Sequence, residues 1–203
     1  MAKVIYHYGV MSAGKSQALL QVNHHYQSQG RGTLILKPTV DERDGPEFVV
    51  SKLGNRAPST PISSDDNLFH IVESALLDDK SLSVVLVDEA QFFAPIQIRQ
   101  LTDVADDLDI PVLAYGLRND SFGNLFPGSR TLFEMADELK ELDQICFCGR
   151  KARMNLRFDN NGYVVREGGS VLVGEKAYRS VCRKHWKSVE HVSETQVNIL
   201  REA

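Results

Sequence analysis

The sequence lacks an excess of positive charge and any long apolar run. Its 203 residues carry 23 Lys and Arg against 27 Asp and Glu, a net charge of −4, so no positive field gathers nucleic acid or anionic lipid non-specifically. Its apolar runs have the length of strands, as at Val84 to Val87, whereas a membrane-spanning helix needs about 20 apolar residues. We therefore expect neither a nucleic-acid partner nor a membrane partner.

Cysteine is also scarce, with three in the chain, all in its last third. An odd, clustered set is more typical of metal ligands in a reducing compartment than of a disulfide framework. The apolar stretch of a secretory signal is missing, because Gly9 and Lys15 follow the first residues at once. These features predict a cytoplasmic protein.

The remaining composition is that of a globular protein, with 42% hydrophobic and 25% charged residues. The length leaves room for one full domain and a small appendage. Strand-like and helix-like segments alternate along the first part, which predicts an α/β fold with a mostly parallel sheet and helices on both faces. The predicted strands and helices are, in chain order, 3–8, 15–28, 33–36, 68–76, 82–87, 96–108 and 111–115.

Three details of this pattern are also expectations. Asp65 and Asp66 precede the second helix and are expected to cap it. Residues 37–61 are polar, contain Pro and Gly, and are expected to be partly mobile. After Tyr115 the α/β alternation is expected to stop, although one short apolar helix follows.

The last third has a different character. Four glycines separate short strand-like pieces at 163–165 and 170–173, so this unit has little core of its own and needs a cross-link to be stable. We expect a nucleotide-binding domain at 1–142, a small second domain at 143–191 and a polar tail at 192–203.

A phosphate-binding loop begins where the first predicted strand ends. The segment matches G-x-x-x-x-G-K-S and precedes a predicted helix, as this motif requires. Backbone N–H groups and the helix dipole bind phosphates there, Lys15 reaches the β- and γ-phosphates, and Ser16 is a Mg²⁺ ligand. The predicted ATP-binding residues are Gly9, Val10, Met11, Ser12, Ala13, Gly14, Lys15 and Ser16.

Two acids end the aliphatic strand 82–87. A phosphate loop needs a carboxylate on a neighbouring strand to hold Mg²⁺, and ligands of open α/β sheets bind at the carboxyl ends of strands. We assign Asp88 to Mg²⁺ and Glu89 to general base catalysis. The glutamate alone leaves two reactions open, because it can activate water in an ATPase or accept a proton from a substrate hydroxyl in a kinase.

The cysteines and one histidine form a metal-binding pattern. Cys146-x-Cys148 is followed, after 33 intervening residues, by Cys182-x-x-His185, which supplies the four ligands of a closed, structural Zn²⁺ site. Free thiols with a surface histidine are the alternative, because the first pair is more closely spaced than usual.

Taken together, these motifs resemble the type II thymidine kinases, especially the bacterial branch. The similarity runs in order over about residues 3 to 187. Besides the phosphate loop and the metal-binding pairs, it is carried by Lys37-Pro38, Asp41-Glu42-Arg43, Asp88-Glu89-Ala90-Gln91-Phe92-Phe93, Tyr115-Gly116-Leu117-Arg118, Leu125-Phe126-Pro127-Gly128-Ser129 and Tyr178-Arg179-Ser180-Val181.

The resemblance implies a P-loop parallel sheet with a small zinc-stapled lasso domain, and transfer of the ATP γ-phosphate to the 5′-hydroxyl of thymidine or deoxyuridine. It implies that Glu89 accepts the proton and that Asp88, Glu89, Ala90 and Gln91 line the ATP side. It also implies a homotetramer and feedback inhibition by thymidine triphosphate (dTTP).

The resemblance further assigns residues to the nucleoside. Met11, Phe92 and Tyr178 match family positions around it, and a lasso loop closes over the base through the backbone of Ser170, Val171, Leu172 and Val173. Relatives read Asp-Phe-Arg-Gly where this chain reads Asp120-Ser121-Phe122-Gly123. Either Phe122 or Phe126 therefore contacts the base. Packing alone is the alternative role for Met11 and Phe92.

Two other functions use the same loop. A P-loop ATPase coupled to a macromolecular partner would use Glu89 to activate water, but the acidic chain has no basic stripe or second motor domain. A nucleotide-gated switch would bind ATP tightly without turnover. Thymidine-dependent ADP formation separates both from a kinase.

Overall fold

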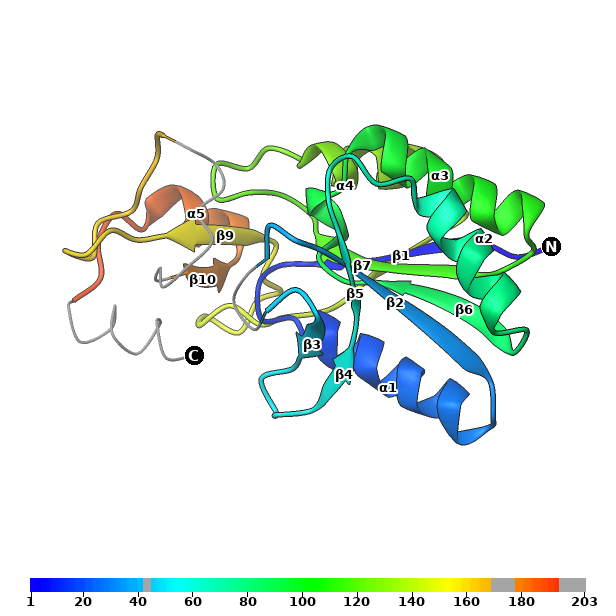
Figure 1. Ribbon diagram of the computed structural model, residues 1–203. Helices are drawn as coiled ribbons and strands as arrows, with labels where there is room; N and C mark the ends of the chain where they lie inside the picture. Colours follow the sequence, from blue (N-terminus) through cyan, green and yellow to red (C-terminus); the bar gives the residue numbers. More distant parts are fainter. Residues whose placement is uncertain (42–44, 169–177, 194–203) are drawn as a thin grey trace.

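The computed structural model describes residues 1–41, 45–168 and 178–193. Its centre is a six-stranded sheet in the order β5-β2-β6-β7-β1-β8, with every neighbouring pair parallel (Figure 1). The strands are β1 (Val4–Gly9), β2 (Gly32–Pro38), β5 (Thr60–Ile62), β6 (Leu82–Val87), β7 (Val112–Leu117) and β8 (Glu138–Glu141). The predicted parallel sheet is confirmed.

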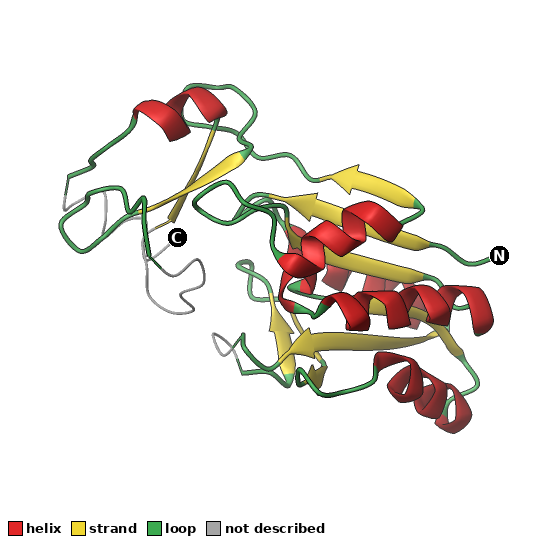
Figure 2. Ribbon diagram, turned by 90° about the horizontal axis from the view of Figure 1, so that it is seen from above, coloured by secondary structure: helices red, strands yellow, loops and turns green. Residues whose placement is uncertain are grey.

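Helices cover both faces of this sheet. On one face, Leu19 of α1 (Lys15–Ser28) packs in a cluster with Leu86. The other face carries α2 (Leu68–Asp78), α3 (Pro95–Asp107) and α4 (Pro127–Met135), and Leu101 and Leu132 pack there with Val85 (Figure 2). The central strands are aliphatic because helices bury them on both sides. Among the described residues, no helix is both long and apolar enough to cross a membrane.

The alternation continues past Tyr115, contrary to the sequence-based expectation. Helix α4 leads into β8, which pairs in parallel with β1 as a sixth strand. This strand reads Glu-Leu-Lys-Glu and forms one edge of the sheet. Strand β8 was not predicted because its side chains are mostly polar. An edge strand tolerates charged side chains that a central strand does not.

One local expectation was also wrong. The helix cap is Asn67, whose side chain accepts a hydrogen bond from the His70 backbone N–H at 3.2 Å. Asp66 instead accepts from the Ser63 N–H at 2.7 Å. Three strands in this region were not predicted. The polar stretch 37–61 contains a hairpin of β3 (Phe48–Val50) and β4 (Arg56–Pro58), and its end runs into β5. These three-residue strands are too short to show alternation in the sequence.

The small unit is an antiparallel ribbon of β9 (Met154–Arg157) and β10 (Tyr178–Val181), followed by α5 (Arg183–Ser188). The strand expected at 163–165 is reduced to single bridges made by Tyr163 and Val164, and 170–173 lie outside the described residues. Strand β9 was not predicted because Asn155 and Arg157 are polar. Both side chains are nevertheless buried, at 2% and 3% exposed.

The small unit packs directly on the phosphate loop. Its core contains Cys146, Leu156, Phe158 and Val181, and the same cluster includes Val10 of the loop. Val192, the first residue of the predicted tail, is buried in this cluster too. The loop therefore lies between the parallel sheet and the small unit.

Candidate active site and metal centre

The phosphate loop turns sharply between β1 and α1. Gly14 adopts a left-handed backbone with φ of +79°, which glycine accepts without a steric penalty. A side chain at Gly9 would place its Cβ 2.9 Å from the Leu142 carbonyl oxygen, so only glycine fits there. Lys15 is 8% exposed, and its Nζ donates to the Val10 carbonyl at 2.8 Å. The predicted loop residues 9–16 thus form one curled segment with its lysine folded inward.

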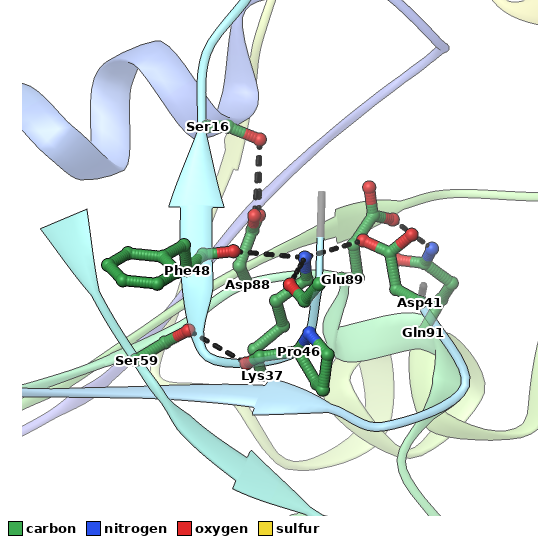
Figure 3. Close-up of polar contacts among 10 residues, drawn as sticks. Ser16, Lys37, Asp41, Pro46, Phe48, Ser59, Asp88, Glu89 and Gln91 are labelled. Carbon is green, nitrogen blue, oxygen red and sulfur yellow. Dashed lines mark hydrogen bonds and ion pairs between the residues drawn. The ribbon is translucent and has the colours of Figure 1, made fainter. Parts of the chain in front are cut away.

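Asp88 faces this loop from the carboxyl end of β6. Strand β7 separates β6 from β1 in the sheet, and Ser16 spans that gap. Its Oγ donates to the Asp88 carboxylate, at 3.2 Å from one oxygen and 3.4 Å from the other (Figure 3). A hydroxyl and a carboxylate that converge in this way are oxygen ligands of the kind Mg²⁺ prefers.

Glu89 is held in place by the residues that follow it. It has a left-handed backbone with φ of +47°, which is uncommon for a residue with a side chain and costs on the order of 1–3 kcal/mol. Gln91 Nε2 donates to Glu89 Oε2, while Gln91 Oε1 accepts from the Leu117 N–H at 2.9 Å. The second bond fixes the orientation of the amide, so the Glu89 carboxylate is positioned by β7.

The short 3-10 turn η1 (Ala90–Phe92) is held from the other side by helix α4. A Cβ at Gly128 would lie 2.6 Å from the Ala90 carbonyl and 2.7 Å from the Phe93 carbonyl. The first turn of α4 therefore touches the backbone that carries Glu89, which is a reason for glycine in the Phe-Pro-Gly segment.

Burial changes the acidity of Asp88. Its side chain lies among residues that exclude water and next to Glu89, and these two effects raise the pKa of the Asp88 carboxyl to about 7. Lys15 and Ser16 act in the opposite direction, because both stabilise the carboxylate. A cation bound between Ser16 and Asp88 would favour the ionised form in the same way.

This pKa predicts a pH-dependent stability of the metal-free and nucleotide-free protein. Because Asp88 holds its proton up to about pH 7 when folded but loses it near pH 4 when unfolded, its contribution to stability is fully present below about pH 4. That contribution falls as pH rises through about 7. Urea unfolding between pH 5 and 8 measures it, and Asp88→Asn should flatten the decline. An equal decline in Asp88→Asn would contradict the assignment.

Lys37 is a buried residue of the site to which the sequence analysis gave no role. Its side chain is 2% exposed at the end of β2 and lies 3.3 Å from the Asp41 carboxylate. Its Nζ also donates to the carbonyls of Gly45 and Phe48, at 3.0 and 3.1 Å (Figure 3). A buried lysine needs such partners, so Lys37 holds the start of β3 and the residues just before it against the carboxyl end of β2, close to Asp88. The Lys37-Pro38 pair was noted in the sequence, but the sequence did not show that the lysine side chain is buried.

The aromatic residues assigned to the nucleoside fall into two groups. Phe92 and Phe126 pack edge to face, with ring centroids 5.7 Å apart. Phe122 instead lies against Arg157, whose guanidinium carbon is 5.2 Å from the centroid of the Phe122 ring. Tyr178 opens β10. The lasso positions 170–173 lie outside the described residues, so the structure does not place them.

Met11 is tied to the small unit through its backbone. Its N–H donates to Asn155 Oδ1 at 3.0 Å, and its carbonyl accepts from Ser180 Oγ at 2.7 Å. Gln144 Nε2 donates to the next carbonyl, that of Ser12, at 2.8 Å. The sequence analysis assigned no role to these three residues. Ser180 lies within the Tyr178-Arg179-Ser180-Val181 motif, whereas no motif marks Asn155 or Gln144.

The four predicted metal ligands converge. The ligand atoms of Cys146, Cys148, Cys182 and His185 all lie within 4.8 Å of one another. Two sulfurs bound to one tetrahedral Zn²⁺ are about 3.8 Å apart, and the sulfurs of Cys148 and Cys182 are separated by 3.9 Å. The backbone N–H of His185 lowers the pKa of the Cys182 thiol, which favours the thiolate that a metal binds. The donor set fits Zn²⁺.

Known proteins match the sequence of this chain over most of its length. The thymidine kinase family model matches residues 2–186, a span that contains the phosphate loop, Asp88, Glu89 and all four converging ligands. The chain belongs to the thymidine kinase family.

Individual members of the thymidine kinase family align over nearly their whole length. A thymidine kinase of Rhodopirellula baltica is 50% identical over 188 residues, covering 92% of this chain and 89% of the relative. Thymidine kinases of Shewanella oneidensis and Coxiella burnetii are 46% and 43% identical over 188 residues. They cover 92% of this chain and 97% and 96% of their own lengths. The resemblance inferred from the motifs is confirmed.

Proposed function

We propose that this protein transfers the γ-phosphate of ATP to the 5′-hydroxyl of thymidine, giving thymidine monophosphate and ADP in pyrimidine deoxynucleotide salvage. Membership of the thymidine kinase family supports this function. The observation that carries the chemistry is the convergence of the phosphate loop, Asp88 and Glu89 at the carboxyl ends of parallel strands. Phosphoryl transfer requires little covalent work from the protein, so positioned charges suffice.

Each charged group has one role in this proposal. The phosphate loop binds the triphosphate, and Lys15 balances the charge that develops on the transferred group. Ser16 and Asp88 would hold Mg²⁺, which neutralises phosphate oxygens when it is bound. Glu89 accepts the proton of the 5′-hydroxyl as its oxygen attacks the γ-phosphorus, and ADP leaves with the electrons of the broken P–O bond.

The nucleoside pocket follows from the same arrangement. We propose that Phe92 and Phe126 form one wall, because Phe92 follows Glu89 closely in η1 and packs on Phe126. Phe122, Met11, Tyr178 and the lasso backbone at 170–173 remain the other proposed contacts. Water excluded by such a pocket cannot compete with the 5′-hydroxyl.

Several finer assignments are proposals based on the resemblance. They comprise deoxyuridine as a second substrate, dTTP as a feedback inhibitor, a homotetramer and a cytoplasmic location. We also propose the domain limits 1–142 and 143–191, with the tail at 192–203. The convergence of the three thiols on one ligand set supports a reducing compartment.

A direct assay tests the function. ADP and nucleoside monophosphate are measured in parallel from ATP and Mg²⁺ with thymidine, deoxyuridine, deoxycytidine or no nucleoside. The kinase predicts one thymidine monophosphate per ADP and little ADP without a nucleoside. ADP without monophosphate would favour the macromolecule-coupled ATPase, and tight ATP binding without turnover would favour the nucleotide-gated switch.

A structural Zn²⁺ is also proposed, and its removal gives a prediction. Structural zinc stabilises small modules by on the order of 10 kcal/mol, because binding and folding are coupled. We expect one zinc per chain, and we expect His185→Ala to lose zinc to a weak chelator together with thymidine kinase activity. His24→Ala, at an exposed histidine of α1, is the matched control. Full activity in metal-free protein would contradict a structural role.

A further inference from the structure

We propose that Asn155 is a positioning residue that holds the phosphate loop in register with the nucleoside side of the active site. This inference rests on the proposed thymidine kinase reaction. Asn155 lies on β9 of the small unit, yet its side chain contacts residues far away in the sequence. It is 2% exposed, so its hydrogen bonds are made out of contact with water.

The Asn155 amide joins three segments. Its Oδ1 accepts from the Met11 N–H in the phosphate loop at 3.0 Å and from Ser180 Oγ on β10 at 3.3 Å. Its Nδ2 donates to the Asn119 carbonyl at 3.3 Å. The orientation of the amide is settled by chemistry, because a backbone N–H can only donate and a carbonyl can only accept.

These segments belong to opposite sides of the reaction. Met11 lies in the loop that binds the ATP phosphates. Asn119 begins the segment that leads to Phe122 and Phe126, and Ser180 lies two residues after Tyr178 on the same strand. One buried side chain therefore connects the backbone around the phosphoryl donor to the backbone around the acceptor.

A second contact fastens the same acceptor segment to the small unit. Trp186 of α5 donates from Nε1 to the Ser121 carbonyl at 3.0 Å. Gly123 adopts φ of +90°, and a Cβ there would lie 3.5 Å from the Trp186 ring. The 119–123 segment is thus held at two carbonyls, whereas Met11 is held at both its N–H and its carbonyl.

This geometry predicts which kinetic constant changes. Each substrate has further contacts of its own, so loss of Asn155 should affect the binding of either one little. The in-line alignment of the 5′-hydroxyl with the γ-phosphate depends on the relative position of the two segments, and a displacement of about 1 Å can cost about a hundredfold in rate. Asn155 would therefore act mainly on kcat.

The test is steady-state kinetics of Asn155→Ala with ATP and thymidine, alongside the wild type. We expect kcat to fall about 30-fold, while KM for each substrate changes less than about threefold. Asn161→Ala, the same change at an exposed asparagine of the small unit, is the matched control and should keep wild-type kinetics. Zinc content and thermal unfolding report whether each variant is folded.

A second measurement does not depend on activity. Amide hydrogen exchange of the peptide covering residues 9–16, without substrates, should be faster in Asn155→Ala than in the wild type, because the Met11 N–H loses its acceptor. Ser180→Ala removes the donor to the Met11 carbonyl and leaves Asn155 in place, so its kcat should fall by about threefold to tenfold. If Asn155→Ala does not fold, the kcat of Ser180→Ala decides.

Three results would overturn the proposal. They are an unchanged kcat in folded Asn155→Ala, a rise in KM alone, and unchanged exchange of the phosphate-loop peptide. A merely structural asparagine would lower the unfolding temperature and leave the kcat of the folded enzyme unaltered. If the wild type forms no thymidine monophosphate, the proposed function has failed instead, and the exchange measurement still tests the connection between Asn155 and the loop.

Discussion

Glu89→Gln is expected to lower kcat for thymidine phosphorylation about a thousandfold, within the range of about 10²–10⁴ that a positioned general base contributes. Glutamine has nearly the same shape but cannot accept the proton of the 5′-hydroxyl. Its amide would also meet the Gln91 Nε2 that now donates to Glu89. In the proposed mechanism the phosphate loop and Lys15 bind the triphosphate, so the affinity for an unreactive ATP analogue should stay within about threefold of the wild type.

Two variants separate this role from general disturbance of the site. Glu134→Gln makes the same change at an exposed glutamate of α4 and should be fully active. Glu89→Asp keeps the acid but withdraws the carboxylate by one methylene, so kcat should be intermediate. Undiminished turnover in Glu89→Gln would remove Glu89 from the role of base.

Lys15→Ala is expected to weaken both nucleotide binding and turnover, with kcat falling by about 10²–10³. In the proposed mechanism Lys15, which is 8% exposed, is the cation that reaches the phosphates from within the loop. It also stabilises the ionised Asp88, so its loss should raise the pKa of that carboxyl further. The affinity for the ATP analogue should therefore fall together with kcat, unlike in Glu89→Gln.

An exposed lysine supplies the control for this prediction. Lys80→Ala, just before β6, removes one positive charge without touching the site. Its kinetics should match those of the wild type at low and high salt. Unchanged ATP affinity with full activity in Lys15→Ala would contradict the phosphate-loop assignment.

Much of the candidate site could be predicted because it is local in the sequence. The phosphate loop needs glycines and a lysine at fixed spacing between a strand and a helix, and β1 and α1 form where the apolar pattern predicts them. Asp88 and Glu89 end a strand whose aliphatic residues alone indicate burial on both faces. The candidate metal ligands are paired by short spacings, and the fold brings the two pairs together.

Other features escaped sequence analysis because their signals are not local. The edge strand β8 is stabilised by its pairing with β1 across more than 130 residues, as between Ile5 and Glu138, and its polar side chains resemble those of a loop. The three-residue strands β3, β4 and β5 are too short for a periodic pattern. The N-cap of α2 is Asn67 rather than Asp65 or Asp66. All three residue types can cap a helix, and local backbone geometry selects among them.

By itself, the sequence determined the family and indicated the candidate chemistry: a loop for phosphates, two carboxylates at a strand end, and three thiols with one imidazole as candidate metal ligands. Tertiary structure alone decided how these parts are held in register. Asn155 and Ser180 reach Met11 from 144 and 169 residues away, and Gln91 orients Glu89 only because β7 offers the Leu117 N–H. Sequence motifs indicate which groups take part in the chemistry. Burial and long-range hydrogen bonds position those groups, and they exist only once distant segments have packed together.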